Sequence, residues 1–374
     1  MHLSDLHLGK RVYEFSMIED QKHILKQIVD IAEREQVDGV MLAGDIYDKP
    51  VPSAESVMVL DVFLTQLAEK KIPVFAVSGN HDSAERIAFG AQLMNSRGIY
   101  LSPVYDGNAE KISLYDEYGE IVIYLLPFIR PSVVRHAYPQ EEIGSYQDAA
   151  AAAVRHMNIN PAVRNILVAH QFVTGASRCE SEDVTVGGVD NVDAAVFESF
   201  DYVALGHIHS PQKMGRETVR YCGTPLKYSF SEADQQKTVT IVELAEKGTI
   251  TLRAVELRPL HDMRRIRGTY MELTAQDFYK AADTEDYILA VLTDEDDVID
   301  GLQKLRVIYP NLMRLEYDNR RTRQNQIIIE AKELERKSEL ELFEEFYELQ
   351  NNQPMSAFQR ELAETMFQEL GERE

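Results

Sequence analysis

Cysteine is scarce in this sequence: the 374 residues contain two, Cys179 and Cys222. A low count in a chain without an export signal is typical of free thiols in a reducing compartment rather than of a disulfide framework. Neither cysteine lies beside the histidines and aspartates described below, so we expect neither of them to bind a metal.

Long apolar runs and targeting signals are also missing. No apolar stretch approaches the roughly 20 residues that a membrane-spanning helix needs, and the N-terminus lacks the charged and apolar regions of a secretory signal. We therefore expect a cytoplasmic protein without a membrane segment. The length of 374 residues predicts more than one domain.

Positive charge is in deficit, since 39 Lys and Arg stand against 62 Asp and Glu, giving a formal net charge of -23. Proteins that bind nucleic acid through a broad basic face neutralise phosphates with many Lys and Arg side chains, and the composition argues against that mode. An acidic chain can still process phosphates where bound cations reverse the local charge.

Polar residues follow apolar runs at several points of the sequence. Such a run predicts a buried strand whose next residues lie at the carboxyl edge of a sheet. Residues 40–43 lead to Gly44-Asp45-Ile46-Tyr47-Asp48, residues 73–77 to Gly79-Asn80-His81-Asp82, residues 166–169 to His170, and residues 202–205 to Gly206-His207-Ile208-His209. Asp5 and His7 follow a short run at 2–4, and their spacing of two lets them share one metal.

Segments with helical periodicity lie between the first of these predicted strands. Residues 16–35 and 53–71 carry apolar side chains at helical spacing, and the resulting two βαβ units predict an α/β sheet with right-handed crossovers. After Gly98 the pattern changes to strands at 111–114 and 120–126, joined by a hairpin, which predict a second sheet packed on the first. A helix at 145–157 precedes His170, and closing strands are expected over 221–241 and 249–255, up to a boundary at Arg258-Pro259.

The remaining residues predict a smaller α/β domain and a helical end. We expect strands at 266–273, 287–292 and 312–317 and a helix at 298–308. Two amphipathic helices follow within 330–374, the second opened by a Ser356 and Gln359 capping box. Its apolar face, with Phe358, Leu362 and Met366, would either fold back onto its own domain or fill a partner's groove, and length alone does not decide between them.

Five of the ten histidines fall at the predicted strand ends. Any one of them alone would more often be a structural histidine than a ligand. Five at consecutive sheet exits, interleaved with Asp5, Asp45, Asn80 and Asp82, are hard to explain by packing, because carboxylates are rarely buried unpaired. Carboxylate, amide oxygen and imidazole are the groups that hard or borderline divalent metals prefer, so the pattern predicts a metal site.

These motifs, Asp5-x-His7, Gly44-Asp45-x-x-Asp48, Gly79-Asn80-His81-Asp82, His170 and Gly206-His207-x-His209, resemble the calcineurin-like metallophosphoesterase superfamily. The resemblance implies an α/β fold, a four-layer αββα sandwich with two divalent metal ions at the sheet edge. It also implies that one ion takes Asp5, His7 and His209, that the other takes Asn80, His170 and His207, and that Asp45 bridges both.

A narrower resemblance is carried by residues 4–10, by the stretch Gly223-Thr224-Pro225-Leu226-Lys227-Tyr228-Ser229-Phe230-Ser231-Glu232, and by the C-terminal region. These are similar to the nuclease subunits of bacterial SbcCD-type complexes, a double-strand-break repair family, and the similarity is weakest after about residue 320. One departure is that only four residues precede Asp5, so the first strand is expected to be short.

The narrower resemblance implies a DNA nuclease, a double-strand exonuclease and single-strand endonuclease that processes breaks and hairpins with an SbcC-like ATPase. It implies a homodimer within a heterotetramer and favours Mn²⁺, while the ligand types also admit Mg²⁺, Fe²⁺ or Zn²⁺. The expected domains are a nuclease domain at 1–260, a smaller C-terminal α/β cap domain facing DNA at 261–325, and terminal helices at 326–374 that dock the ATPase.

The ligand types suggest a mechanism. Two divalent ions can lower the pKa of a shared water and clamp the scissile phosphate. His81, beside Asn80 but carrying its own imidazole, is the candidate proton donor to the leaving alkoxide, and Asp48 is the candidate to orient it. The candidates to hold DNA phosphates are Lys10, Arg11, Arg86 and Lys227, although exposed Lys and Arg are usually just solvated.

Two other functions fit parts of the sequence. A phosphomonoesterase or cyclic-nucleotide phosphodiesterase could use the same core but would need neither the second domain nor the terminal helices. A scaffold with a vestigial metal site is a further alternative, and the complete ligand set counts against it. The C-terminal region is therefore the feature that discriminates between them.

Overall fold

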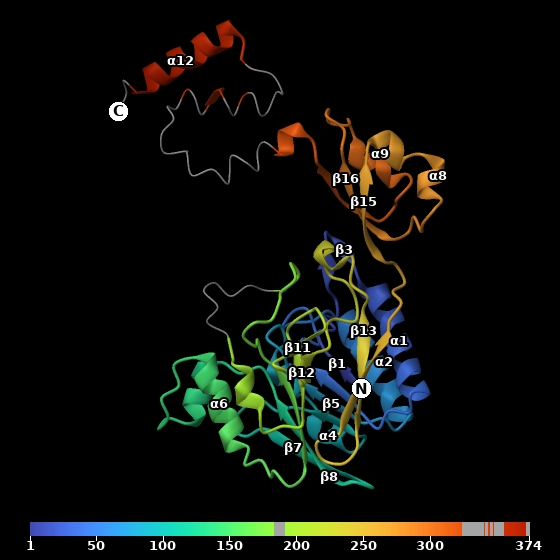
Figure 1. Ribbon diagram of the computed structural model, residues 1–374, viewed down its shortest axis with the longest axis vertical. Helices are drawn as coiled ribbons and strands as arrows, with labels where there is room; N and C mark the ends of the chain where they lie inside the picture. Colours follow the sequence, from blue (N-terminus) through green and yellow to red (C-terminus); the bar gives the residue numbers. More distant parts are fainter. Residues whose placement is uncertain (183–190, 324–339, 341–342, 345–346, 348–354, 372–374) are drawn as a thin grey trace. The chain divides into compact units, whose positions relative to one another are not determined.

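The computed structural model describes residues 1–182, 191–323, 340, 343–344, 347 and 355–371 (Figure 1). The chain divides into two compact units, Met1–Met263 and Arg264–Glu374. Within the described ranges, no helix is long and apolar enough to cross a membrane.

The first sheet of the first unit has its N-terminal strand near its centre. Strands β1, β4, β5 and β6 run parallel; β13 pairs antiparallel with β1, and β14 pairs antiparallel with β13 at the edge. In spatial order the strands are β14 (Ile250–Glu256), β13 (Thr238–Leu244), β1 (His2–Leu3), β4 (Val40–Ala43), β5 (Val74–Val77) and β6 (Ile99–Leu101). Although β1 is as short as the sequence suggests, pairing on both sides buries it completely.

The second sheet is built mainly from the middle of the chain. Strands β8, β9, β10 and β12 run parallel, with β7 and β11 antiparallel at the two edges. In spatial order they are β11 (Gln212–Met214), β12 (Arg216–Tyr221), β10 (Tyr202–Gly206), β9 (Arg164–His170), β8 (Gly119–Leu126) and β7 (Glu110–Asp116).

The two sheets pack face to face because their central strands are apolar on both faces. Met41 and Ala43 of β4 share one buried cluster with Val168 of β9 and Ala204 of β10, which fills the space between the sheets. Alternate side chains of the second sheet point the other way, into a cluster with helix α6 (Tyr146–His156). Figure 1 shows α1 and α2 on one side of the strands and α6 on the other, so the expected four-layer αββα sandwich is confirmed.

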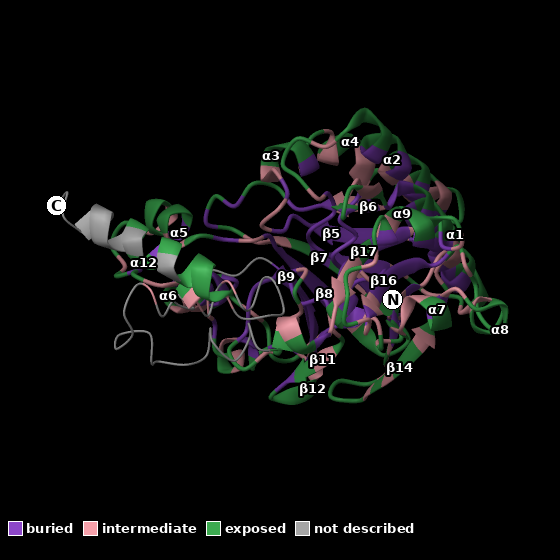
Figure 2. Cartoon of the chain, turned by 90° about the horizontal axis from the view of Figure 1, so that it is seen from above, coloured by how far each residue is buried: buried purple, intermediate pink, exposed green. Residues whose placement is uncertain are grey.

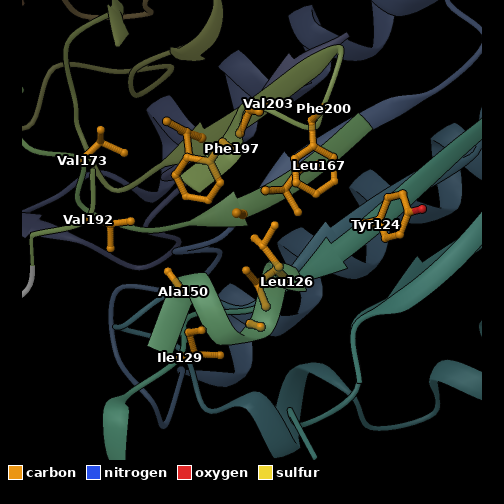
Figure 3. Close-up of a cluster of buried hydrophobic side chains, with 14 of the residues drawn as sticks. Tyr124, Leu126, Ile129, Ala150, Leu167, Val173, Val192, Phe197, Phe200 and Val203 are labelled. Carbon is orange, nitrogen blue, oxygen red and sulfur yellow. The ribbon is translucent and has the colours of Figure 1, made fainter. Parts of the chain in front are cut away.

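The outer cluster of the second sheet is drawn in Figure 3. Leu126 and Leu167 project from the sheet into this cluster, which Ala150 of α6 joins from the helix side. Phe197 and Phe200 close the cluster from the segment before β10, and Tyr124 lies at its far end, with its ring 5.5 Å from that of Phe200. Figure 2 shows the same division more widely: the central strands of the two large sheets are buried, the edge strands β7 and β14 are mostly not, and the helices expose their outer faces. This rigid interior holds the strand ends in place.

Three helices of the first unit, α2, α3 and α6, begin at a serine whose side chain caps them. Ser53 accepts a hydrogen bond from the backbone of Ser56 at the start of α2, and Ser145 and Asp148 form a capping box at the start of α6. The remaining elements of this unit are β2 (Arg11–Val12), β3 (Phe15–Ser16), α1 (Ile18–Arg34), α2 (Ala54–Glu69), α3 (Ala84–Ile87), α4 (Ala91–Asn95), α5 (Pro131–Ala137), η1 (Ala194–Phe197) and η2 (Phe230–Glu232).

The second unit contains a three-stranded sheet in the order β15-β16-β17, packed on short helices around Leu273, Leu305 and Tyr309. Its elements are β15 (Met263–Gly268), α7 (Tyr270–Leu273), α8 (Gln276–Tyr279), β16 (Tyr287–Leu292), α9 (Gly301–Arg306), β17 (Leu312–Tyr317) and α12 (Ala357–Gly371). Ser356 and Gln359 form the expected capping box before α12. The first of the two expected terminal helices falls almost wholly outside the described residues.

Two expected strands are wrong in part. The strand predicted over 266–273 ends at Gly268, because Thr269 and Glu272 form a capping box that starts α7. The closing strand predicted over 221–241 is interrupted: β12 ends at Tyr221 and β13 begins at Thr238. The intervening loop contains η2 and contributes to the site described next.

Candidate metal centre

The candidate ligands lie where five parallel strands end. Asp5 and His7 follow β1, Asp45 follows β4, and Asn80 and His81 follow β5; His170 is the last residue of β9, and His207 and His209 follow β10. The two sheets face each other, so their carboxyl edges bring these side chains together. Apart from Asn80 and His81, which are partly exposed, all of them are buried.

The backbone at these strand ends adopts an unusual conformation. Asp5 has φ 55°, His7 44°, Asp45 47° and His207 108°, all in the left-handed region that residues other than glycine rarely occupy. Backbone hydrogen bonds from Asp5 to Gly44 (3.0 Å) and from His7 to Asp45 (2.9 Å) hold two of the turns together. Such strain persists where the surroundings enforce it, typically at functional sites.

Two glycines permit the close approach of these turns. A Cβ atom on Gly79 would lie 2.1 Å from Oδ1 of Asp45, and one on Gly206 would lie 1.7 Å from the backbone oxygen of Ala43. No larger residue fits at either position without moving the backbone.

The first group of ligands is Asp5, His7 and His209, whose nearest donor atoms all lie within 4.8 Å of one another. Nε2 of His7 and Nε2 of His209 are 3.1 Å apart. Burial lowers the pKa of both imidazoles well below the usual value, so both are neutral and offer lone pairs. Two neutral imidazole nitrogens this close together could both bind one divalent cation.

The second group centres on Asn80. Its Oδ1 atom lies 2.9 Å from Nε2 of His170 and 2.9 Å from Nδ1 of His207. Asp45 lies between the groups, with Oδ2 3.4 Å from Nε2 of His170 and 3.8 Å from Nε2 of His7. This placement is the one a bridging carboxylate requires.

The electrostatics of the site favour bound cations. Burial raises the pKa of Asp5 to about 8, and the charge of Asp45 adds to the increase. Burial also acts to raise the pKa of Asp45, but His170 and His7 outweigh it and hold that pKa well below its usual value. Burial opposes protonation of His170, yet Asp45 raises its pKa to about 9. Protons on Asp5 and His170 thus offset negative charge that divalent cations would neutralise, so the donor set fits such ions.

Asp48 contacts two different parts of the site. Its carboxylate forms an ion pair with Lys10 (2.9 Å) and lies 3.8 Å from Nδ1 of His7, a buried nitrogen without a hydrogen-bond partner among the described residues. Its contact with His81 is made by the main chain instead: the carbonyl oxygen of Asp48 is 3.1 Å from Nδ1 of His81. Nδ1 of His81 therefore donates, and Nε2 is the nitrogen directed toward Asp45, at 3.9 Å.

The four basic candidates for DNA contacts differ in their surroundings. Lys10 is paired with Asp48, and Lys227 donates to the carbonyl of Ala233 (2.6 Å) and to Asp262 (2.8 Å). Both lysines are largely buried in these contacts, whereas Arg11 and Arg86 are exposed.

Three residues that support the site had no assigned role in the sequence. Gln21, buried on α1, accepts from the backbone of Gly9 (2.9 Å) and donates to the carbonyl of His7 (2.7 Å). Tyr228 donates to the carbonyl of Leu6, and Asp82 accepts from three backbone N–H groups, those of Ile46, Tyr47 and Gly79. Gln21 could have been found as a polar residue on the apolar face of a predicted helix, and Asp82 and Tyr228 lie within motifs that the sequence analysis quoted.

Comparison with known proteins identifies the class to which this fold and site belong. Residues 1–211 match the model of the calcineurin-like phosphoesterases, and the chain belongs to that family. Residues 259–351 match a second family, described as type 5 capsule protein repressor C-terminal domain. The chain is also 33% identical, over 319 residues that cover 84% of each sequence, to the D subunit of the nuclease SbcCD of Staphylococcus epidermidis.

Two solved structures are similar at lower sequence identity. The protein TT1561 of Thermus thermophilus is 12% identical, with a TM-score of 0.37, covering 63% of this chain and 94% of its own. A dimetal phosphatase from Danio rerio is 14% identical, with a TM-score of 0.41, covering 69% of this chain and 96% of its own. Family membership and the sequence relative together make the chain a metal-dependent phosphodiesterase of the nuclease type.

The position of Asp45 leads to a prediction. Asp45→Asn should weaken Mn²⁺ binding at both groups, each by at least about 100-fold, because loss of an outer-shell partner alone costs about 10- to 100-fold. The exposed Asp38→Asn is the matched control and should bind as the unaltered chain does. Calorimetric titration checks this, and loss at one group alone would contradict a bridging role.

Proposed function

We propose that the chain is a DNA nuclease that uses two divalent ions, with Mn²⁺ favoured, as a double-strand exonuclease and single-strand endonuclease in the processing of breaks and hairpins. The observation that carries this is the pair of ligand groups that share Asp45, with His81 beside them. Similarity to the D subunit of the nuclease SbcCD supports DNA as the substrate.

When bound, divalent ions supply a hydroxide nucleophile at neutral pH and positive charge on the phosphate oxygens. The ligands proposed for one ion are Asp5, His7 and His209, those for the other are Asn80, His170 and His207, and Asp45 serves both. Their burial excludes bulk water, which strengthens every electrostatic interaction in the site.

His81 is the proposed proton donor to the leaving alkoxide. Its side chain is 20% exposed, whereas that of Asp45 is 3% exposed, so the ring is open to a substrate arriving from solvent. Nδ1 points at the carbonyl of Asp48, which leaves Nε2 as the nitrogen that faces the reaction. Asp48 would thus orient His81 through its main chain, and its carboxylate would act on Lys10 and His7.

Arg11 and Arg86 are the proposed DNA-phosphate contacts, since they are the exposed members of the four basic candidates. Lys10 and Lys227 would instead stabilise the site through their ion pairs. The proposed cap at 261–325 would add further contacts to the duplex.

A homodimer is proposed from exposed apolar side chains on α2, on α4 and on the turn between α3 and α4. These are Val57 (44%), Met58 (67%), Val62 (53%), Phe89 (83%) and Leu93 (81%). Where exposed apolar side chains form a patch, the patch often marks a protein contact. Light scattering checks the proposal, and a mass near the 42.7 kDa of one chain would contradict it.

The terminal helix α12 is the proposed docking element for an SbcC-like ATPase, which would complete a heterotetramer. Phe358 (74% exposed), Leu362 (52%) and Met366 (57%) follow one another at helical spacing on its surface. An apolar helical face of this kind is what a partner groove recognises.

The test of this function compares three substrates with the purified chain in Mn²⁺: linear duplex DNA, single-stranded DNA and a small aryl phosphoester. We expect both DNA substrates to be degraded, because a phosphodiester held by the two ions would have the exposed His81 beside it. Hydrolysis of the small ester without either DNA would support the phosphomonoesterase or cyclic-nucleotide phosphodiesterase alternative instead.

The role of His81 yields a second prediction. His81→Ala should abolish DNA cleavage, a loss of about 100-fold or more from the missing general acid, while Mn²⁺ still binds. The exposed His136→Ala provides the matched control and should cleave normally. Loss of Mn²⁺ from His81→Ala would show instead that His81 is a ligand.

The role of α12 can be tested in the same way. Removal of the residues after about 330 should preserve basal nuclease activity and abolish co-purification with the ATPase. Leu362→Asp should weaken that association as well, while Glu364→Gln, an exposed change on the same helix, should not. Unchanged co-purification of the shortened chain would rule out docking through this region.

A further inference from the structure

His209 is tied to residues that lie outside the five motifs. Nδ1 of His209 is 2.6 Å from Oγ of Ser181, and the same hydroxyl donates to Oε1 of Glu232 at 2.6 Å. A serine hydroxyl has one proton, and a carboxylate can only accept, so the Ser181 proton goes to Glu232. Ser181 therefore accepts the proton of Nδ1, which leaves the lone pair of His209 on Nε2, the nitrogen that faces His7.

Glu232 is itself held firmly. It is fully buried and forms an ion pair with Lys237 (2.6 Å), which is 4% exposed. Oε1 also accepts from the hydroxyl of Ser229 (3.0 Å), and Lys237 donates in addition to the carbonyl of His209 (3.0 Å). A buried carboxylate with these partners has little freedom, so it fixes the position of the Ser181 hydroxyl.

The residue after Ser181 contacts the main chain of the same histidine. Oε1 of Glu182 accepts from the backbone N–H of His209 at 2.6 Å, and Oε2 accepts from the backbone of Cys179 at 3.1 Å. Two consecutive residues of the segment between β9 and η1 thus hold both the ring and the backbone of His209. His170 differs, because its Nδ1 donates to the carbonyl of Ala43 (2.9 Å), in the first sheet.

We propose that Ser181 is a positioning residue for the first metal ion: together with Glu232 and Lys237 it selects the tautomer of His209 that can bind metal and fixes its ring. Residues 179–182, which follow β9, thereby contribute to metal affinity without providing a ligand. This inference rests on the proposed role of His209 as a ligand. Outer-shell partners of this kind raise metal affinity by about 10- to 100-fold.

The experiment uses an isosteric pair of variants in the full chain, titrated calorimetrically with Mn²⁺ alone, without DNA. Ser181→Val removes the hydroxyl. It should lower the affinity for one of the two Mn²⁺ ions by about 10- to 100-fold and leave the affinity for the other unchanged. Ser181→Thr has the same shape as valine but keeps the hydroxyl, and should bind both ions nearly as the unaltered chain does. Ser177→Val, an exposed change on the same segment, should have no effect.

The outcomes separate this inference from the function on which it rests. Equal affinities in Ser181→Val and Ser181→Thr would overturn the role of the hydroxyl, even with two ions bound. If Ser181→Val lowers the affinity for both ions equally, the assignment of Ser181 to His209 would be overturned. Absence of Mn²⁺ binding in the unaltered chain would contradict the two-metal function itself. If neither Ser181 variant folds, Glu232→Gln provides a second test and should lower the affinity for that same ion alone.

Discussion

The site depends on one buried carboxylate that two groups of ligands share. Asp45 lies within 4 Å of a ring nitrogen from each group, and it stays ionised in spite of its burial because the surrounding imidazoles favour its charged form. It is the one carboxylate that both groups of candidate ligands approach among the residues that the structure describes. The two packed sheets therefore hold five strand ends around a single side chain.

Those strand ends could be predicted from the sequence because their signals are local. Asp45, Asn80, His170 and His207 lie at most three residues beyond an apolar run, so the position of each relative to its strand is fixed within a few residues. The layered core was predictable for the same reason, since alternating faces of β4 and β9 follow from uninterrupted apolar runs. The family motifs then named the ligands but gave no distances.

The parts that could not be predicted are those that depend on distant contacts. Ser181 and Glu232 are 51 residues apart and meet at His209 through a loop with no periodic pattern. Asp48 appeared to be a side-chain partner of His81, yet only the fold shows that its carbonyl makes that contact. The strand expected to continue to Leu273 failed for a local reason, because the capping preference of Thr269 and Glu272 exceeded the β tendency of the residues around them.

The ion pairs of Lys10 and Lys227 also determine how this acidic protein approaches a polyanion. Both lysines near the motifs are paired with carboxylates within the fold, so of the four basic candidates only the exposed Arg11 and Arg86 remain to displace counterions from a nucleic acid. Electrostatic attraction at the site would then come mainly from the metal ions. As a result, the affinity for DNA would depend weakly on ionic strength and strongly on the supply of divalent cations, unlike that of a nuclease with a basic groove.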